Sequence, residues 1–349
     1  MGAPPHASPH LPVREDWLAL RQEEILEPAL PIVDPHHHLW DRPGARYLLE
    51  ELLRDTGSGH DVRATVYVQA RSMYRADGPE ASRPVGETEF ANGVAARCAS
   101  GLYGPIRACA GIVGMVDLML GDAVAPLLEQ HVRAGGERFR GIRNQTAWHA
   151  LPEINSNPVP PRRGLLSEPA FLRGAGRLRE HGLSLDIWAY HTQLDEVLAL
   201  ARALPDLPIV LDHAGGPLGA GPYAGQRDAV FAEWSARMRR LAGCPNVVVK
   251  LGGLGMAVNG FGFERQALPP TSAQLAQAWR PYVEFCIEAF GAARCMFESN
   301  FPVDKGSCGY AVLWNAFKRL AAGASAEEKA ALFSGTACRV YRLRPGGGA

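Results

Sequence analysis

Short apolar and β-branched runs alternate with amphipathic segments along most of the chain. The segments, such as AVAPLLEQHVRAGG and LDEVLALARALPD, place apolar residues three and four positions apart, which is typical of helices. Strands that alternate with helices predict a parallel sheet. Eight runs have the length and composition of strands: LPIVDPH (30–36), ATVYVQA (64–70), ACAGIVGMV (108–116), FRGIRNQ (139–145), LSLDIWAY (183–190), PIVLDHA (208–214), NVVVKLG (246–252) and RCMFESN (294–300).

Eight strand and helix units favour a sheet that closes on itself. We therefore expect one α/β domain, a single (β/α)8 barrel of the TIM type over residues 30–345, preceded by an N-terminal extension over residues 1–29. An open, doubly wound sheet is the alternative fold. The last helix is expected to begin after Ser325, because Glu328 follows three residues later and completes a capping box.

Polar residues recur where the predicted strands end. In a (β/α)8 barrel these ends meet at one mouth, where the chemistry takes place. The residues found there, in chain order, are Asp34, His36, His38, Gln69, Arg71, Arg143, Asn144, Tyr190, His191, Asp212, His213, Lys250, Glu298, Asn300 and Asp304.

The stretch VDPHHHLWD at residues 33–41 contains three consecutive histidines. Side chains alternate along a strand, so His36 and His38 are expected to share a face with Asp34, while His37 faces the other way. Two imidazoles in that arrangement can bind one divalent cation or one anionic oxygen. The spacing therefore predicts a binding site at the first strand.

Other strand-end residues suggest how a substrate would be held. Arg143 carries a guanidinium that can bind a carboxylate through two hydrogen bonds, so we expect a carboxylated small molecule. Arg71 would enclose the same anion from the second loop, beside Gln69 at the same strand end. Tyr190 and His191 are expected to form a pocket wall, with His191 as a metal ligand as the alternative.

Composition narrows the functional classes. Lys plus Arg and Asp plus Glu each number 36, so no global positive field for nucleic acid or membrane is expected. The sequence contains no run of 18 apolar residues, so no membrane span is expected. The seven cysteines lack CxxC spacing, which argues against a disulfide framework and a thiolate zinc site and favours the reducing cytoplasm. The sequence leaves open whether the chain forms a homo-oligomer.

Several motifs, taken in this order, resemble the amidohydrolase superfamily, and within it the branch that contains sugar-lactone and 2-pyrone-4,6-dicarboxylate lactonases. They are DPHHHLWD, ETE (87–89), FRGIRNQ, VLDHAGGP, FESNFPVDK and the closing GTACRVYRL, and together they cover about residues 31–343. The resemblance implies a distorted (β/α)8 barrel and a hydrolase that opens a lactone. It also implies that His36, His38 and His213 bind either one zinc or manganese ion or, without metal, the substrate itself.

The chain departs from this family at the eighth strand. The family typically has GSDWP there, and its aspartate is the general base for the attacking water, whereas this chain has Asn300 at that position. An amide cannot take a proton from water at neutral pH. The base would then be Asp304, in the loop beyond the strand, or Glu298, two residues before Asn300.

Three functional hypotheses follow. The first is a hydrolase that opens the lactone of a sugar acid or of a carboxylated ring-cleavage product. The second is a metal-dependent decarboxylase of an aromatic acid, a reaction that the same branch performs. The third is a non-catalytic protein that binds a ligand, with Asn300 marking a lost base.

Overall fold

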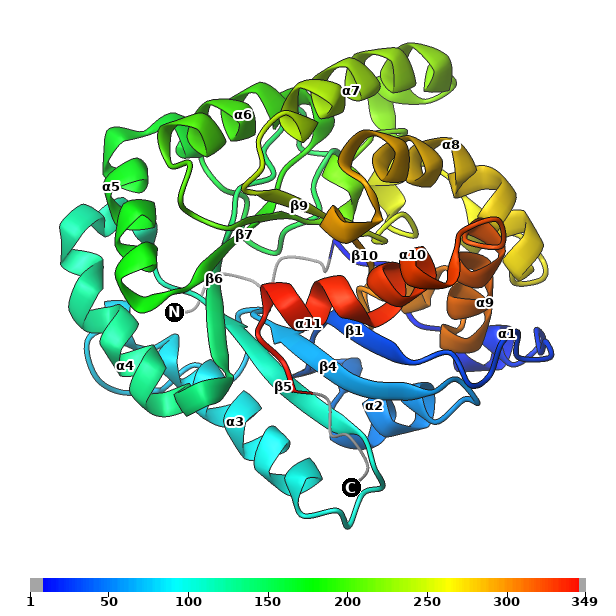
Figure 1. Cartoon of the computed structure of the whole chain (residues 1–349), viewed down its shortest axis with the longest axis horizontal. Coiled ribbons are helices and arrows are strands. Elements are labelled where there is room, and N and C mark those ends of the chain that lie inside the picture. Colours follow the sequence, from blue (N-terminus) through cyan, green and yellow to red (C-terminus); the bar gives the residue numbers. More distant parts are fainter. Residues whose placement is uncertain (1–8, 345–349) are drawn as a thin grey trace.

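Eight parallel strands form one sheet around a common axis in the computed structural model, which describes residues 9–344 (Figure 1). Neighbouring strands follow the chain order, as expected for successive strand and helix units. The strands are β1 (Ile32–His37), β4 (Val62–Val68), β5 (Arg107–Gly114), β6 (Phe139–Gln145), β7 (Ser184–Trp188), β8 (Ile209–Leu211), β9 (Val247–Leu251) and β10 (Cys295–Phe297). All eight predicted strands are confirmed.

The barrel closes through residues at and just beyond the ends of its first and last strands. His37 and Phe301 form an isolated parallel bridge, and the His38 amide donates to the Phe301 carbonyl at 2.7 Å. The Asn300 amide donates to the His36 carbonyl at 2.9 Å. This confirms the (β/α)8 barrel and excludes the open sheet. Because a single bridge, and not a regular ladder of hydrogen bonds, joins β1 to the segment after β10, the barrel closes with distorted geometry.

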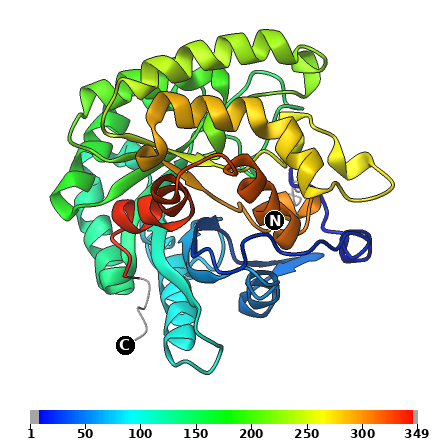
Figure 2. The ribbon, with the colours of Figure 1, turned by 45° about the vertical axis from the view of Figure 1, so that its right-hand side comes forward.

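Helices surround the barrel, and α7 packs beside α8 on its outside (Figures 1 and 2). The predicted capping box is confirmed, since the Glu328 amide donates to Ser325 Oγ and the Ser325 amide donates to the Glu328 carboxylate. The described helices are α1 (Glu15–Leu18), α2 (Leu49–Thr56), α3 (Val85–Ala99), α4 (Ala125–Gly135), α5 (Pro169–Arg177), α6 (Leu194–Ala203), α7 (Arg227–Ala242), α8 (Ser272–Phe290), α9 (Tyr310–Leu320), α10 (Ala326–Ala330) and α11 (Thr336–Val340). Between residues 9 and 344, no helix combines the length and apolar character that a membrane crossing needs.

Apolar side chains fill the barrel at the end opposite the strand carboxyl ends. Val66, Val113 and Val210 come from three strands and pack in one buried cluster with Tyr341 and Leu343, which follow α11. Each fully buried valine of this kind stabilises the fold by about 1.5–3 kcal/mol. The closing helix therefore seals one end of the barrel and leaves the other end for a site.

Asp34 does not share a face with His36. Its carboxylate accepts hydrogen bonds from the Tyr310 hydroxyl of α9 (3.1 Å) and from the Ser299 amide (3.0 Å), so it lies at the junction of β1 and β10. The strand register shifts between Asp34 and His37, which breaks the regular alternation of side chains. The expected placement of Asp34 was therefore wrong, while His37 faces away as predicted and contacts Thr65 Oγ1 at 2.8 Å.

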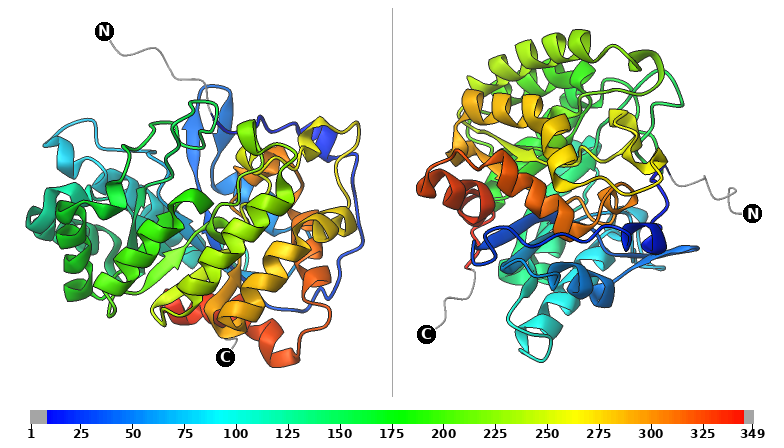
Figure 3. Two further views of the ribbon diagram at one scale, coloured as in Figure 1. Left: turned by 90° about the horizontal axis from the view of Figure 1, so that it is seen from above. Right: turned by 90° about the vertical axis from the view of Figure 1, so that its right-hand side faces the viewer.

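The described part of the N-terminal extension runs along the open end of the barrel. Trp17 Nε1 donates to the Gln266 carbonyl at 3.1 Å, and Arg21 Nε donates to the Pro269 carbonyl at 3.1 Å. The dark-blue α1 and the red α11 lie at opposite ends of the molecule (Figure 3). Residues 1–8 of the predicted extension lie outside the described part of the chain. A short hairpin, β2 (Trp40–Arg42) with β3 (Ala45–Tyr47), also stands at the open end.

Candidate active site

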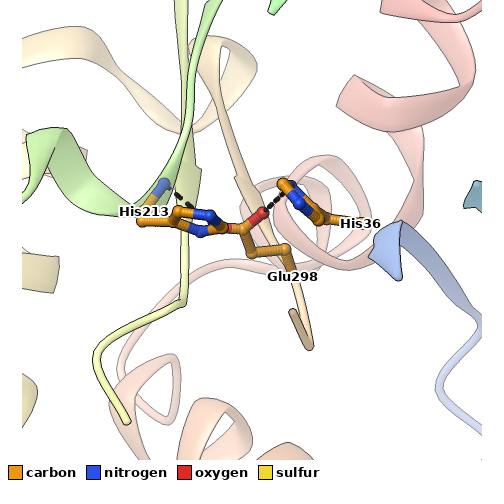
Figure 4. A group of neighbouring side chains, drawn as sticks. All are labelled: His36, His213 and Glu298. Carbon is orange, nitrogen blue, oxygen red and sulfur yellow. Dashed lines mark hydrogen bonds and ion pairs between the residues drawn. The ribbon is translucent and has the colours of Figure 1, made fainter. Parts of the chain in front are cut away.

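The carboxylate of Glu298 lies between two imidazoles at the open end of the barrel (Figure 4). Its oxygens are 2.7 Å from His36 Nδ1 and 2.7 Å from His213 Nδ1. The His213 amide also donates to Glu298 Oε1 at 3.0 Å, which the left-handed backbone of His213 (φ 55°) permits. Burial disfavours the ionised carboxyl, but the adjacent His213 and His36 outweigh burial and hold the pKa of Glu298 well below its ordinary value.

Hydrogen bonds set which ring nitrogen of His38 and His213 is available. His38 Nδ1 lies 2.8 Å from the Val68 carbonyl, which can only accept, so Nδ1 carries the proton. His213 Nδ1 faces the Glu298 carboxylate, which also accepts. In their neutral forms both rings therefore keep a lone pair on Nε2. Burial is the main cause that keeps the pKa of His38 well below its ordinary value, and the positive charge of Arg143 is the second cause.

Two buried cations flank His36. Arg143 Nη1 lies 3.1 Å from His36 Nε2, and Lys250 Nζ lies 3.2 Å from His36 Nδ1. Lys250 also pairs with Asp186 at 2.8 Å and with Asp212 at 3.1 Å. Burial lowers the pKa of Lys250, but the two carboxylates reverse the effect and raise it, so Lys250 is a fixed positive charge.

Asn300 faces the site with its amide oriented by Asp304. Asn300 Nδ2 donates to Asp304 Oδ1 at 2.8 Å, while the Gly255 amide donates to Asp304 Oδ2 at 2.8 Å. The Asn300 carbonyl oxygen and the second hydrogen on Nδ2 are therefore left for a ligand. Burial raises the pKa of Asp304 to about 7. The Asp304 carboxylate lies behind Asn300 and does not line the pocket.

A small pocket lies over these groups, with a cavity volume of about 30 Å³. That volume holds little more than one water molecule, so a substrate enters only when a covering side chain moves. No aspartate or glutamate is among the lining residues within the described chain. They are His10, His38, Trp40, Arg42, Ala70, Arg143, Gln145, Ser156, Asn157, Pro158, Trp188, His213, Met256, Asn300 and Val303.

The structure brings only some of the predicted substrate-binding residues to this pocket. Arg143 lines it, and the Gln69 carbonyl accepts from Arg143 Nη2, so Gln69 supports that arginine through its backbone. Arg71 is exposed and reaches Gln145 Oε1 at 3.2 Å at the pocket rim. Tyr190 and His191 do not line the pocket: the Tyr190 hydroxyl contacts Ser156 Oγ at 2.8 Å, and the His191 ring packs on Tyr223.

The sequence did not predict several residues that line the pocket or support it. Trp40 and Arg42 follow the histidine run on β2, and His10 comes from the N-terminal extension, whose course over the barrel no local pattern indicates. Asp186 lies inside β7. A charged residue between the apolar neighbours of LSLDIWAY was the sequence feature that could have indicated a buried charge there. A charged residue inside a barrel strand needs a buried partner, and Lys250 is that partner.

Three side chains could hold a metal ion. The ligand atoms of His36, His213 and Glu298 all lie within 4.8 Å of one another, and these are donor types that zinc and manganese accept. This set contains two of the three predicted ligands. His38, the third, has its ring centroid 4.9 Å from that of His36.

Comparisons with known proteins identify the family. The Amidohydrolase family model matches residues 33–343. The Sinorhizobium fredii protein named "Uncharacterized protein y4mH" is 34% identical and covers 90% of this chain and 99% of its own. L-fucono-1,5-lactonase of Burkholderia ambifaria is 30% identical and covers 90% of this chain and 97% of its own.

A solved structure extends the likeness to three dimensions. An amidohydrolase from Burkholderia multivorans, crystallised with bound zinc, is 27% identical with a TM-score of 0.69 and covers 90% of this chain and 99% of its own. Since the family model spans most of the chain and near full-length relatives reach 30% identity or more, this chain is an enzyme of the amidohydrolase family.

Proposed function

We propose that this amidohydrolase opens the lactone of a sugar acid or of a carboxylated ring-cleavage product by hydrolysis. One observation carries the proposal: His38 and His213, whose Nε2 atoms keep a lone pair, line the pocket together with Asn300 and two arginines, and none of the lining residues in the described chain is a carboxylate. These side chains can bind a water molecule, an electrophilic carbonyl and an anionic group. The L-fucono-1,5-lactonases among the relatives support lactone hydrolysis.

The substrate is proposed to carry a carboxylate. Arg42 and Arg143 line the pocket, and their guanidinium groups prefer a planar carboxylate. Arg143 Nε is fully buried and has no hydrogen-bond partner among the described residues. A buried donor without a partner costs about 1–3 kcal/mol. A substrate oxygen at this nitrogen would recover that energy.

The Glu298–His213 pair is proposed to activate the attacking water. Glu298 holds the proton of His213 on Nδ1, which leaves Nε2 to accept a proton from water, and the carboxylate stabilises the imidazolium that forms. In this arrangement Glu298 acts through His213, and Asp304 acts by orienting Asn300.

The donor set of His36, His213 and Glu298 fits one divalent cation in number and type. When bound, such an ion would supply Lewis acidity for the carbonyl oxygen. His36 would enter that set while contacting Lys250 and Arg143, whose positive charges oppose a further cation at this imidazole.

The first test measures hydrolysis of a panel of sugar-acid and carboxylated lactones by acid release. The assay uses the purified chain before and after chelation, with bound metal measured by plasma mass spectrometry. We expect turnover of at least one carboxylated lactone at several times the rate of its neutral analogue. If no lactone turns over in either preparation, the proposal is wrong. Carbon dioxide release from an aromatic acid would then identify a decarboxylase, and binding without any turnover would identify a ligand-binding protein.

The proposed compartment is the reducing cytoplasm. All seven cysteines are free thiols, and six of them are buried. Buried thiols are protected from oxidation and cannot form the disulfide framework of a secreted protein without rearrangement of the core.

A further inference from the structure

A second cavity lies at the end of the barrel opposite the candidate active site. It has a volume of about 880 Å³, within the range of small-molecule sites. The elements around it, α3, α4, β5 and β6, lie together in the lower left of Figure 1. Six arginines line this arginine cavity: Arg107, Arg133, Arg138, Arg140, Arg342 and Arg344. Glu137 is the single carboxylate in the lining among residues 9–344.

Most of these arginines have no ionic partner. Only Arg133 pairs with a carboxylate, Glu129, at 3.5 Å on the exposed side of α4. Within the part of the chain that is described, the other five have no carboxylate within 4.0 Å. Their hydrogen bonds go to neutral groups, such as Asn92 Oδ1 from Arg138 and the Gly182 carbonyl from Arg342.

Several surface arginines elsewhere in the described chain are paired with acids. Elsewhere on the surface, single arginines contact two acids each: Arg46 contacts Glu50 and Glu51, Arg177 contacts Asp122 and Glu180, and Arg237 contacts Asp195 and Glu233. Around the arginine cavity, by contrast, five of the six arginines have no carboxylate within 4.0 Å among the described residues, although they share one concave surface.

The cavity also shows uncompensated charge at Arg140. Its Nε is fully buried without a partner among the described residues, although Nη2 donates to the Arg342 carbonyl at 3.3 Å. Burial lowers the pKa of Arg140, repulsion from Arg342 and Arg344 adds to this shift, and attraction to Glu137 only partly offsets it. Arg342 itself has a left-handed backbone (φ 50°), which is uncommon for arginine. An anion in the cavity would supply both the missing acceptor and the missing charge.

We infer that the arginine cavity is a binding site for a small multivalent oxyanion of the phosphate class, such as the triphosphate of a nucleotide or of an inorganic polyphosphate. Several guanidinium groups around one cavity match the tetrahedral oxygens of linked phosphates. The cavity volume allows more than one phosphate group. This site is separate from the lactone pocket, and the inference does not depend on the proposed reaction.

Isothermal titration calorimetry with inorganic tripolyphosphate and with adenosine triphosphate tests the inference at about 0.15 M salt. We expect saturable binding of at least one of them at one site per chain. Equal affinities would mean that phosphate alone is recognised, and tighter binding of the nucleotide would mean that the neighbouring apolar surface contributes. No saturable binding of either probe would overturn the inference.

Two matched double variants distinguish binding at a specific site from nonspecific attraction to the positive charge of the protein. The variant with Arg140→Gln and Arg342→Gln is expected to weaken binding at least tenfold. The variant with Arg177→Gln and Arg280→Gln removes the same charge from exposed ion pairs and is expected to bind like the parent. If the first variant fails to fold by circular dichroism, Arg133→Gln with Arg344→Gln, both exposed, replaces it with the same expectation. Unchanged affinity in the folded cavity variant, or equal loss in both variants, would show that no such site exists.

Discussion

Each oxygen of the Glu298 carboxylate faces the Nδ1 atom of a different histidine, His36 on one side and His213 on the other. The residue lies one position beyond β10, so its place is fixed by the strand and by the bridge that closes the barrel. A buried carboxylate in this position orients both imidazoles, and it stabilises the positive charge that a histidine gains when it accepts a proton.

Replacing Glu298 by glutamine tests this role. Glu298→Gln keeps the shape of the side chain but removes the charge that stabilises the His213 imidazolium. We expect kcat for lactone hydrolysis to fall about 10²–10⁴-fold, the usual range for losing general base assistance, with little change in KM. Steady-state kinetics measure this, with circular dichroism as the check on folding. The matched control, Asp304→Asn, changes the groups that contact Asn300 and the Gly255 amide, and it should lower kcat less than tenfold. A larger effect at Asp304 than at Glu298 would assign the base to Asp304.

The sequence predicted the location of those pocket residues that stand at strand ends. His38, Arg143, His213 and Asn300 stand at strand ends, and the barrel carries all of them into one pocket. Tyr190 also follows a strand, but its hydroxyl reaches Ser156, because the chain turns into the short helix His191–Gln193 immediately afterwards. Local pattern identifies the strand end, whereas the direction of the next turn depends on tertiary contacts.

The N-terminal extension contributes an element of the pocket that lies outside the span of the family match. The family model begins at residue 33, yet His10 lines the pocket and stacks on Trp40 with ring centroids 5.7 Å apart. The extension is bound to the loop after β9 by hydrogen bonds such as that from Arg14 Nη2 to the Glu264 carbonyl. These contacts join residues about 250 positions apart, so no sequence window could predict them.

This element is expected to control access to the pocket. A cavity of about 30 Å³ cannot hold a lactone, and His10 is the lining residue contributed by the described part of the extension. His10→Ala should raise kcat/KM about three- to tenfold for a bulky lactone and less for a small one, because it removes the side chain that must move. Comparing kcat/KM across lactones of increasing size measures the effect. A uniform fall for all sizes would show instead that His10 contacts the substrate.

At the scale of the whole molecule, the regular alternation of strands and helices was predictable because each strand has its own apolar run. The ion pairs inside the barrel were only partly predictable from the sequence. Lys250 was recognised as a strand-end residue, but its pairing with Asp186, and the hydrogen bond from the Tyr341 hydroxyl to Asp186, join distant parts of the chain. Such a network needs all its members, since removing one leaves a buried charge without a partner.

The buried histidines make the whole fold sensitive to acid. Burial lowers the pKa of His37 to about 3 and that of His131 to about 4, and the pKa values of His10, His36, His38, His60 and His191 are lowered as well. Between pH 6.5 and 4 the unfolded chain therefore binds protons that the folded chain does not, so the free energy of unfolding falls as the pH falls. Asp34 and Asp304, with pKa values raised to about 6 and about 7, act in the opposite direction. The pKa values of Asp55, Glu87, Asp186 and Glu196 are also raised, so six carboxylates oppose these seven histidines.

We therefore expect the urea midpoint to fall clearly between pH 7 and pH 5. Each such histidine contributes up to about 1.4 kcal/mol per pH unit within this window. His131→Gln removes one of these groups far from the pocket, where His131 Nδ1 contacts Thr88 Oγ1, so it should make the pH dependence shallower by up to that amount. Urea titrations of both proteins at several pH values measure the two slopes. A midpoint that is constant or rises toward pH 5 would mean that the buried carboxylates outweigh the histidines, and the charge balance of the interior would have to be assigned the other way.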